Sequence, residues 1–205
     1  ERAVEAYLGM TTGELVKVLG PPARVDPGAY GFDWWIYNQD YTNYLQVGVK
    51  DDRVVAFYTN SRQWSIHGLK LGTERKTVVR QFHLTDQVQA DYDGISYTFT
   101  IPAQIFKERA LKIDGQVVTE FFFDIHDGEK LTAVQVTDLA TFLQSDFNYS
   151  VNISYPSNKK LPDKPKLTPG GDTGTEGTRG QVPCPNTESL DWETGFLPIL
   201  IRPLS

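Results

Sequence analysis

The residues best suited to chemistry stand together at one predicted hairpin turn, where Asp124, His126 and Asp127 follow each other closely. On an extended strand, Asp124 and His126 share a face about 7 Å apart, a spacing that suits two metal ligands or an acid–base pair. The same residue types are also common in solvated turns. A hydrolase or metal-binding site at these residues is therefore the alternative to a non-catalytic function.

The other reactive residues have no partner at a functional spacing. His67 and His83 have no histidine or cysteine at ligand spacing, and isolated histidines are usually structural. Cys184 is the single cysteine of the chain, so neither an internal disulfide nor a multi-cysteine zinc site can form. It stands between Pro183 and Pro185, without a histidine nearby in the sequence. We therefore expect no enzymatic activity, no metal ion and no cofactor.

Charge and hydropathy exclude two classes of partner. The chain has 26 acidic and 20 basic residues, a net charge of −6, whereas nucleic-acid binding relies on clustered lysine and arginine. The longest apolar run, residues 196–201, contains a proline and is far too short to span a bilayer. The sequence predicts no nucleic-acid partner and no membrane span in this chain.

Aromatic residues mark the predicted partner-binding surface. In the alternating run after residue 30, Trp34 falls on one face of a strand and Trp35 and Tyr37 fall on the other. If that second face is exposed, Trp35, Tyr37, Tyr41 and Tyr44 form an apolar surface with hydrogen-bonding groups, which suits a protein or a glycan. The alternative is that the second half of the chain or the C-terminal segment covers these rings.

A capped helix precedes this aromatic strand. Thr11 and Glu14 have the spacing of a capping box, which predicts a helix from residue 11 that ends at a Gly-Pro pair. Leu15, Val18 and Leu19 fall on one face at helical spacing. We expect this face to pack on a sheet.

The period then changes to two, which predicts an antiparallel meander. Alternation over residues 30–37 and 45–49 indicates two strands, and residues 54–59 have the composition of a third. Residues 50–53 form the polar turn between the last two strands. The first half of the chain is therefore a helix followed by a meander.

The same order recurs in the second half. Residues 72–82 repeat the glycine and the short helix, residues 95–101 alternate strictly, and residues 117–136 read as a hairpin with a glycine-containing turn. An insertion around residues 104–113, which we predict to be helical, makes this half longer. The predicted fold is α+β, with two diverged repeats over about residues 9–60 and 72–136, each a short helix packed on an antiparallel β-meander.

The end of the chain has a different composition. We predict a short helix capped by Thr137 and a closing strand over residues 149–155, which completes a domain of residues 1–155. Residues 156–189 are rich in proline and glycine and indicate a flexible linker. Residues 190–205 form a short apolar C-terminal segment.

Three stretches carry a family resemblance: residues 9–24, with the capping box and Gly-Pro-Pro; residues 30–37, with two adjacent tryptophans; and residues 47–55, with Asp51-Asp52. Together they resemble the CAP-associated N-terminal domain of secreted or surface proteins of Gram-positive bacteria, over about residues 5–150. The resemblance implies an extracellular or cell-surface location and no established activity. The sequence lacks the histidine and glutamate motifs of a CAP domain itself, since its last histidine is His126.

The leading functional hypothesis joins the resemblance to the aromatic surface. It is a non-catalytic extracellular accessory or protein-binding module that regulates or positions a linked or partner domain at the cell surface. The expected partners are a protein, a linked domain or a cell-wall component.

Overall fold

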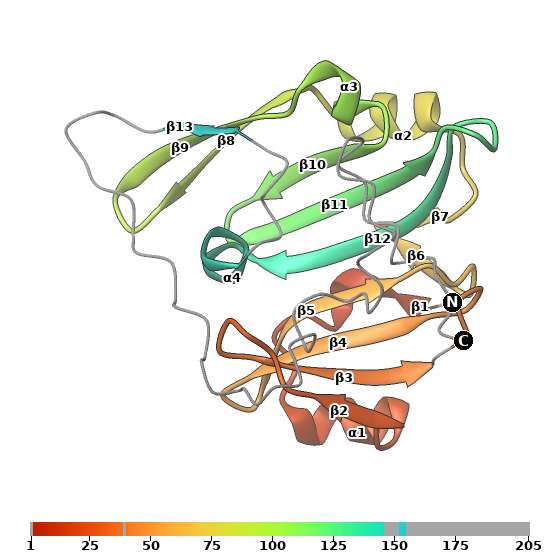
Figure 1. Cartoon of the computed structure of the whole chain (residues 1–205), viewed down its shortest axis with the longest axis vertical. Coiled ribbons are helices and arrows are strands. Elements are labelled where there is room, and N and C mark those ends of the chain that lie inside the picture. Colours follow the sequence, from red (N-terminus) through yellow and green to blue (C-terminus); the bar gives the residue numbers. More distant parts are fainter. Residues whose placement is uncertain (1, 39, 146–151, 155–205) are drawn as a thin grey trace.

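The computed structural model describes residues 2–38, 40–145 and 152–154, and its centre is a seven-stranded antiparallel sheet (Figure 1). From one edge to the other, its strands are β10 (Arg109–Asp114), β11 (Val117–Asp124), β12 (Lys130–Asp138), β5 (Arg53–Thr59), β4 (Leu45–Lys50), β3 (Asp33–Asn38) and β2 (Arg24–Asp26). The halves of the chain meet in the middle, where β5 pairs with β12.

Smaller elements surround this sheet. One three-stranded sheet has the order β1 (Arg2–Ala3), β6 (Trp64–Ile66) and β7 (Leu69–Lys70), and another has the order β13 (Asn152–Ser154), β9 (Ile95–Thr100) and β8 (Gln87–Tyr92). The helices are η1 (Val4–Ala6), α1 (Thr12–Leu19), α2 (Arg75–Phe82), α3 (Ala103–Phe106) and α4 (Leu139–Gln144). The α+β class predicted from the sequence is confirmed. No helix among the described residues combines the length and the apolar character needed to cross a membrane.

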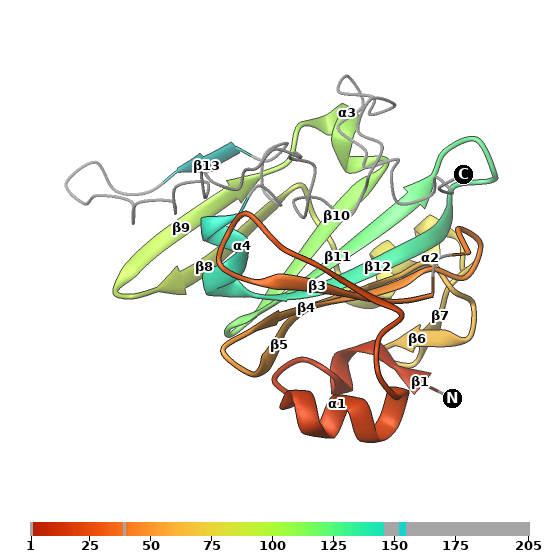
Figure 2. The same ribbon diagram turned by 60° about the horizontal axis from the view of Figure 1, so that its bottom comes forward.

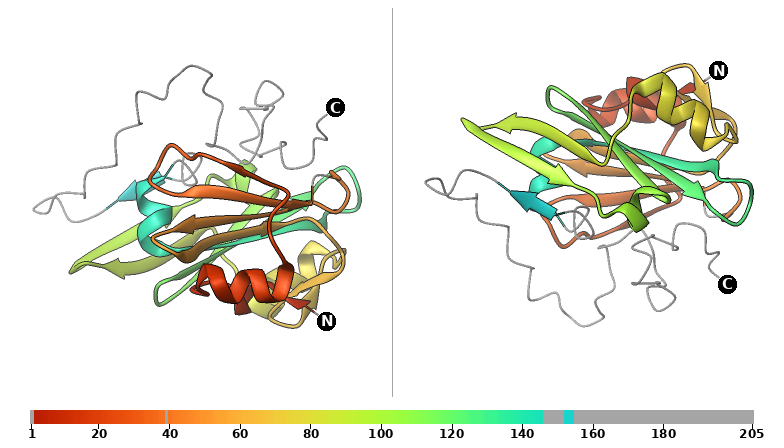
Figure 3. Two further views of the ribbon diagram at one scale, coloured as in Figure 1. Left: turned by 90° about the horizontal axis from the view of Figure 1, so that it is seen from below. Right: turned by 90° about the horizontal axis from the view of Figure 1, so that it is seen from above.

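The first core lies on the face of the seven-stranded sheet that α1 and α2 cover (Figure 3). Val47 and Phe57 project from the sheet and are fully buried, as are Leu15 of α1 and Val78 of α2. The β1–β6–β7 sheet, which lies beside α1 in Figure 2, also contributes side chains to this core. Alternation along β4 and β5 places one set of side chains here and the other set on the opposite face.

The second core lies on that opposite face. Trp34 and Phe122 of the seven-stranded sheet pack in the same cluster as Phe99 of β9 and Phe142 of α4, and each is at most 1% exposed. Both faces of the central sheet are therefore covered, which explains why Trp34 and the neighbouring Trp35 both contact a core.

The N-terminal helix forms as its capping box predicts. The Thr11 hydroxyl accepts a hydrogen bond from the Glu14 backbone N–H at 3.1 Å, and the Glu14 carboxylate accepts one from the Thr11 N–H at 2.9 Å. These bonds satisfy donors that a helix start otherwise leaves open. Leu15 is buried, but Val18 is 52% exposed, so its predicted place on the packed face is wrong.

The hairpin turn between β4 and β5 is also confirmed. Asp51 and Asp52 both have positive φ, at 50° and 64°, as a two-residue turn with the twist of the flanking strands requires. Aspartate tolerates this left-handed conformation better than most residues.

Two local predictions in the second half need correction. The expected helical insertion at residues 104–113 is only the single turn α3, followed by β10, because residues 109–114 pair with β11 along its free edge. The cap of α4 is Asp138 rather than Thr137, because Thr137 is still paired with Ala56 in the sheet. The predicted strand at 149–155 is described only as β13, and the predicted linker and apolar segment, 156–205, lie outside the described residues.

Candidate functional site

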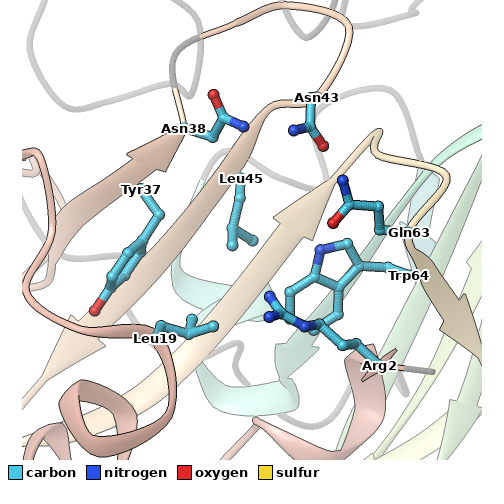
Figure 4. Close-up of a pocket in the computed structure, with 8 residues that line it drawn as sticks. All are labelled: Arg2, Leu19, Tyr37, Asn38, Asn43, Leu45, Gln63 and Trp64. Atoms are coloured by element: carbon cyan, nitrogen blue, oxygen red, sulfur yellow. The ribbon is translucent and has the colours of Figure 1, made fainter.

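A cavity of about 180 Å³ lies where the adjoining ends of β3 and β4 meet the end of α1 and the start of β6 (Figure 4). We call it the Tyr37–Trp64 pocket. Its lining residues are Arg2, Leu19, Tyr37, Asn38, Asn43, Leu45, Gln63 and Trp64. They come from five segments of the first 64 residues, so only the folded chain brings them together.

A β-bulge places two of these side chains in the wall. Ile36 pairs with Gln46 and Asn38 pairs with Leu45, which leaves Tyr37 as an extra residue in β3. A bulge bends its strand and redirects side chains that would otherwise alternate. Tyr37 and Asn38, although adjacent in sequence, therefore both line the pocket.

Side-chain hydrogen bonds fix the rim between β3 and β4. The Asn60 amide donates to the Tyr41 carbonyl at 2.5 Å, and its oxygen accepts from the Tyr44 N–H at 2.8 Å. The Asp40 carboxylate accepts from both the backbone N–H and the hydroxyl of Thr42, which lowers the pKa of Asp40. These bonds order the rim in the free chain, so a ligand that binds there would cause a smaller loss of conformational entropy.

Trp64 presents an edge, not a face, to the pocket. Its ring packs against Phe57 and Tyr7, with centroids 4.9 and 5.2 Å away, and the Arg2 guanidinium lies 5.5 Å from its centroid. Trp64 is only 3% exposed, yet its indole N–H donates no hydrogen bond to a described residue. Figure 4 shows the indole nitrogen on the side of Leu45 and Gln63, facing the cavity.

Tyr37 supplies a neutral wall. Its hydroxyl is buried without a hydrogen-bond partner, and this burial raises the pKa of Tyr37 to about 12. In Figure 4 the hydroxyl points toward Leu19, away from the amide groups at the rim. Among the described residues that line the pocket, Arg2 is the charged one, and the others have amide, aromatic and aliphatic side chains. This lining is suited to recognition by hydrogen bonding.

The four residues predicted to bind a partner do not form one surface. Trp35 is half-buried against the first core, whereas Tyr44 is 5% exposed in the second core and donates to Gln46 at 2.7 Å. Tyr37 lines the pocket, and Tyr41 is 44% exposed on the rim. Of the four, Tyr37 is therefore the one that lines the pocket, and Tyr41 lies on the loop between its lining residues Asn38 and Asn43.

Sequence reasoning missed most of the pocket. Asn38, Asn43, Gln63, Trp64 and Arg2 carry no periodic pattern or motif that links them. The only local signal was the polar segment between two predicted strands, where Asn38 and Asn43 flank the rim.

The alternative site at Asp124, His126 and Asp127 is part of a hairpin turn. β11 ends at Asp124, whose carboxylate accepts the His126 backbone N–H at 2.9 Å, so the strand spacing expected for a shared face does not apply. Asp124 and Asp127 line a cavity of about 60 Å³ together with Arg62 and Lys130, but His126 does not. Among the described residues, no three His, Cys, Asp or Glu side chains form a group that could hold a metal ion.

Comparisons with known structures relate the fold to extracellular proteins. The chain has a TM-score of 0.68 and 26% identity to an extracellular protein containing an SCP domain from Bacillus anthracis str. Ames, covering 82% of this chain and 52% of that one. It has the same TM-score and 19% identity to the cysteine-rich secretory protein SAV1118 from Staphylococcus aureus subsp. aureus Mu50, covering 82% and 56%.

Sequence comparison identifies the family. The chain is 30% identical over 139 residues to the uncharacterized membrane protein YlbC of Bacillus subtilis (strain 168), which is 68% of this chain and 40% of that protein. The chain therefore spans about half or less of each of these relatives. The family description "CAP-associated N-terminal" matches residues 8–147. The chain belongs to the CAP-associated N-terminal domain family.

Proposed function

We propose that this chain is a non-catalytic extracellular accessory module that binds a protein and thereby positions or regulates a linked or partner domain. One observation carries this proposal: the chain matches about half of each of two larger proteins. One is described as an extracellular protein containing an SCP domain, and the other as a cysteine-rich secretory protein. The part of those proteins that this chain does not cover is the natural candidate for the partner.

The rim of the Tyr37–Trp64 pocket is the proposed contact. Tyr41 is 44% exposed between Asn38 and Asn43, and its carbonyl is held by Asn60. An ordered, exposed tyrosine gives a large contact area at a low loss of side-chain entropy. Tyrosine is also among the residues that contribute most to protein interfaces.

The test uses the SCP domain of the Bacillus anthracis protein, expressed alone, as the probe. Biolayer interferometry with the immobilised chain should detect binding, and Tyr41→Ala should weaken it at least tenfold, as loss of an interface tyrosine commonly does. Ile125→Ala is the matched control, because Ile125 is similarly exposed, at 40%, but follows β11 in the other half of the sheet. Equal affinity of wild type and Tyr41→Ala would contradict the proposed contact.

A further inference from the structure

We infer that the Tyr37–Trp64 pocket binds a peptide carboxylate, with the Trp64 indole N–H, the rim amides and the Arg2 guanidinium as its donors. This inference rests on the proposed function, because it names the chemical group of the partner that the pocket recognises.

The Trp64 indole supplies the first donor. The Trp64 side chain is held in place by its packing, with 3% of the residue exposed, and its N–H faces the cavity and donates no hydrogen bond to a described residue. A fixed donor of this kind can bond an acceptor without losing side-chain entropy. An acceptor atom of a ligand in the cavity would take this bond in place of water.

The rim amides add donors on the other side of the cavity. The Asn38 side-chain oxygen already accepts the Asp40 backbone N–H at 3.1 Å, so the NH₂ group is the part of this amide that remains for a ligand. The side chains of Asn43 and Gln63 form no hydrogen bond with a described residue. Figure 4 shows these three amides around one mouth of the cavity.

Charge selects an anion among the acceptors. The Arg2 guanidinium stacks on Trp64 and forms no ion pair with a described residue. None of the described residues that line the pocket is acidic. A guanidinium beside several N–H groups is the arrangement that binds carboxylates with short, charge-assisted hydrogen bonds.

The shape of the cavity favours a peptide over a sugar. Sugar recognition commonly uses a free aromatic face, but the Trp64 ring is packed by Tyr7 and Phe57 and covered by Arg2. Leu19 and Leu45 instead offer an aliphatic wall beside the donors. At about 180 Å³ the cavity is smaller than ordinary drug-sized pockets, and it suits one terminal residue with a small side chain.

The experiment compares two probes that differ only in the carboxylate. N-acetyl-Ala-Ala with a free carboxyl terminus, and the same dipeptide as its C-terminal amide, are titrated into the ¹⁵N-labelled chain. The acid should shift the indole N–H resonance of Trp64, and the amide should bind at least tenfold more weakly, since it lacks the charge.

Three variants assign the binding to the pocket. Trp64→Phe removes the N–H and keeps an aromatic ring, and Arg2→Gln removes the charge; each should weaken binding of the acid about tenfold or more. Arg62→Gln is the matched control, because Arg62 is also an exposed arginine but lines a different cavity. If Trp64→Phe does not fold, Arg2→Gln still tests whether the acid binds in this pocket, because Arg2 is exposed and its replacement leaves both cores intact.

Three results would overturn the inference: equal affinity of acid and amide, no effect of Arg2→Gln, or binding of N-acetylmuramic acid without binding of the dipeptide. The last result would assign the pocket to a saccharide carboxylate. The proposed function is tested separately. If Tyr41→Ala weakens binding of the SCP domain while no dipeptide binds, the accessory function stands and the carboxylate assignment fails.

Discussion

Tyr58 of β5 pairs with Gln135 of β12 at the middle of the seven-stranded sheet, where the two halves of the chain join. From this pair the sheet continues through β4 and β3 on one side and through β11 and β10 on the other. Each half thus contributes three strands in the same order, counted outward from the junction, and β2 of the first half adds a seventh strand at the edge.

The corners beside the junction are also built alike. The Gly9 N–H donates to the Val54 carbonyl at 2.9 Å, and the Gly72 N–H donates to the Leu131 carbonyl at 2.7 Å. Both glycines have positive φ, at 89° and 99°. In each half this corner connects the start of a helix to the start of the strand at the junction.

The first prediction is that the two halves are copies of one unit. In an experimental structure, residues 9–60 and 72–136 should superpose over the helix and the meander. Gly9→Ala and Gly72→Ala should each lower the free energy of unfolding by about 1–2 kcal/mol, because an alanine Cβ is disfavoured at positive φ. An added Cβ meets nothing within 4 Å at Gly9 and only an ordinary 3.5 Å contact with Arg62 at Gly72. Urea unfolding that shows very different losses would argue against equivalent corners.

A second prediction concerns the buried ion pair of β10 and β11. Arg109 and Glu120 are 0% and 1% exposed, with Nε and Oε2 3.0 Å apart, and burial raises the pKa of Glu120. Arg109→Met should destabilise the fold by about 3–5 kcal/mol, because it leaves an uncompensated buried carboxylate. The double variant with Glu120→Leu should lose less than the sum of the single losses. Strict additivity in a double-mutant cycle would show that the pair is not coupled.

The third prediction separates core from surface among the aromatic residues. Trp35 packs against the first core, so Trp35→Ala should lower the free energy of unfolding by about 2–4 kcal/mol through loss of packing. Tyr41→Ala should change it by about 0.5 kcal/mol or less, because Tyr41 is 44% exposed. Thermal unfolding measures both. If Trp35→Ala leaves the midpoint of thermal unfolding unchanged and weakens binding of the partner, Trp35 belongs to the recognition surface and not to the core.

The fourth prediction tests the catalytic alternative. His126 is exposed in the turn after β11, and its backbone N–H donates to the Asp124 carboxylate. His126→Ala should therefore leave stability within about 0.5 kcal/mol of the wild type and leave SCP-domain binding unchanged. Isothermal titration with Zn²⁺ provides a second readout. A metal ion bound by the wild type and lost in the variant would favour the alternative site.

Local signals in the sequence were sufficient for the elements they describe. The Thr11–Glu14 capping box and the Asp51-Asp52 turn depend on bonds within a few residues, and both formed as predicted. Residues 109–114 form a strand because they pair with β11, a contact that local preference does not encode. The pocket could not be predicted for a similar reason: Trp64 of β6 and Tyr37 of β3 line one cavity, although they lie far apart in the sequence and no local pattern links them.

The last prediction uses the unpaired hydroxyl of Tyr37. Because this buried group has no hydrogen-bond partner, Tyr37→Phe should stabilise the fold at neutral pH by about 1 kcal/mol. The pKa of Tyr37 is about 12 in the folded chain, above the value of about 10 for an unfolded tyrosine. Between these values the unfolded chain ionises while the folded chain does not.

Wild type should therefore lose stability relative to Tyr37→Phe as the pH rises from about 10 to about 12, by up to about 1.4 kcal/mol per pH unit. Below about pH 10 the difference between the two proteins should be constant, because neither state ionises Tyr37. Urea unfolding of both proteins at about pH 8 and about pH 11 measures this change, and the comparison cancels the ionisation of the other tyrosines. A difference that is the same at both pH values would mean that the Tyr37 hydroxyl ionises as readily in the folded chain as in water.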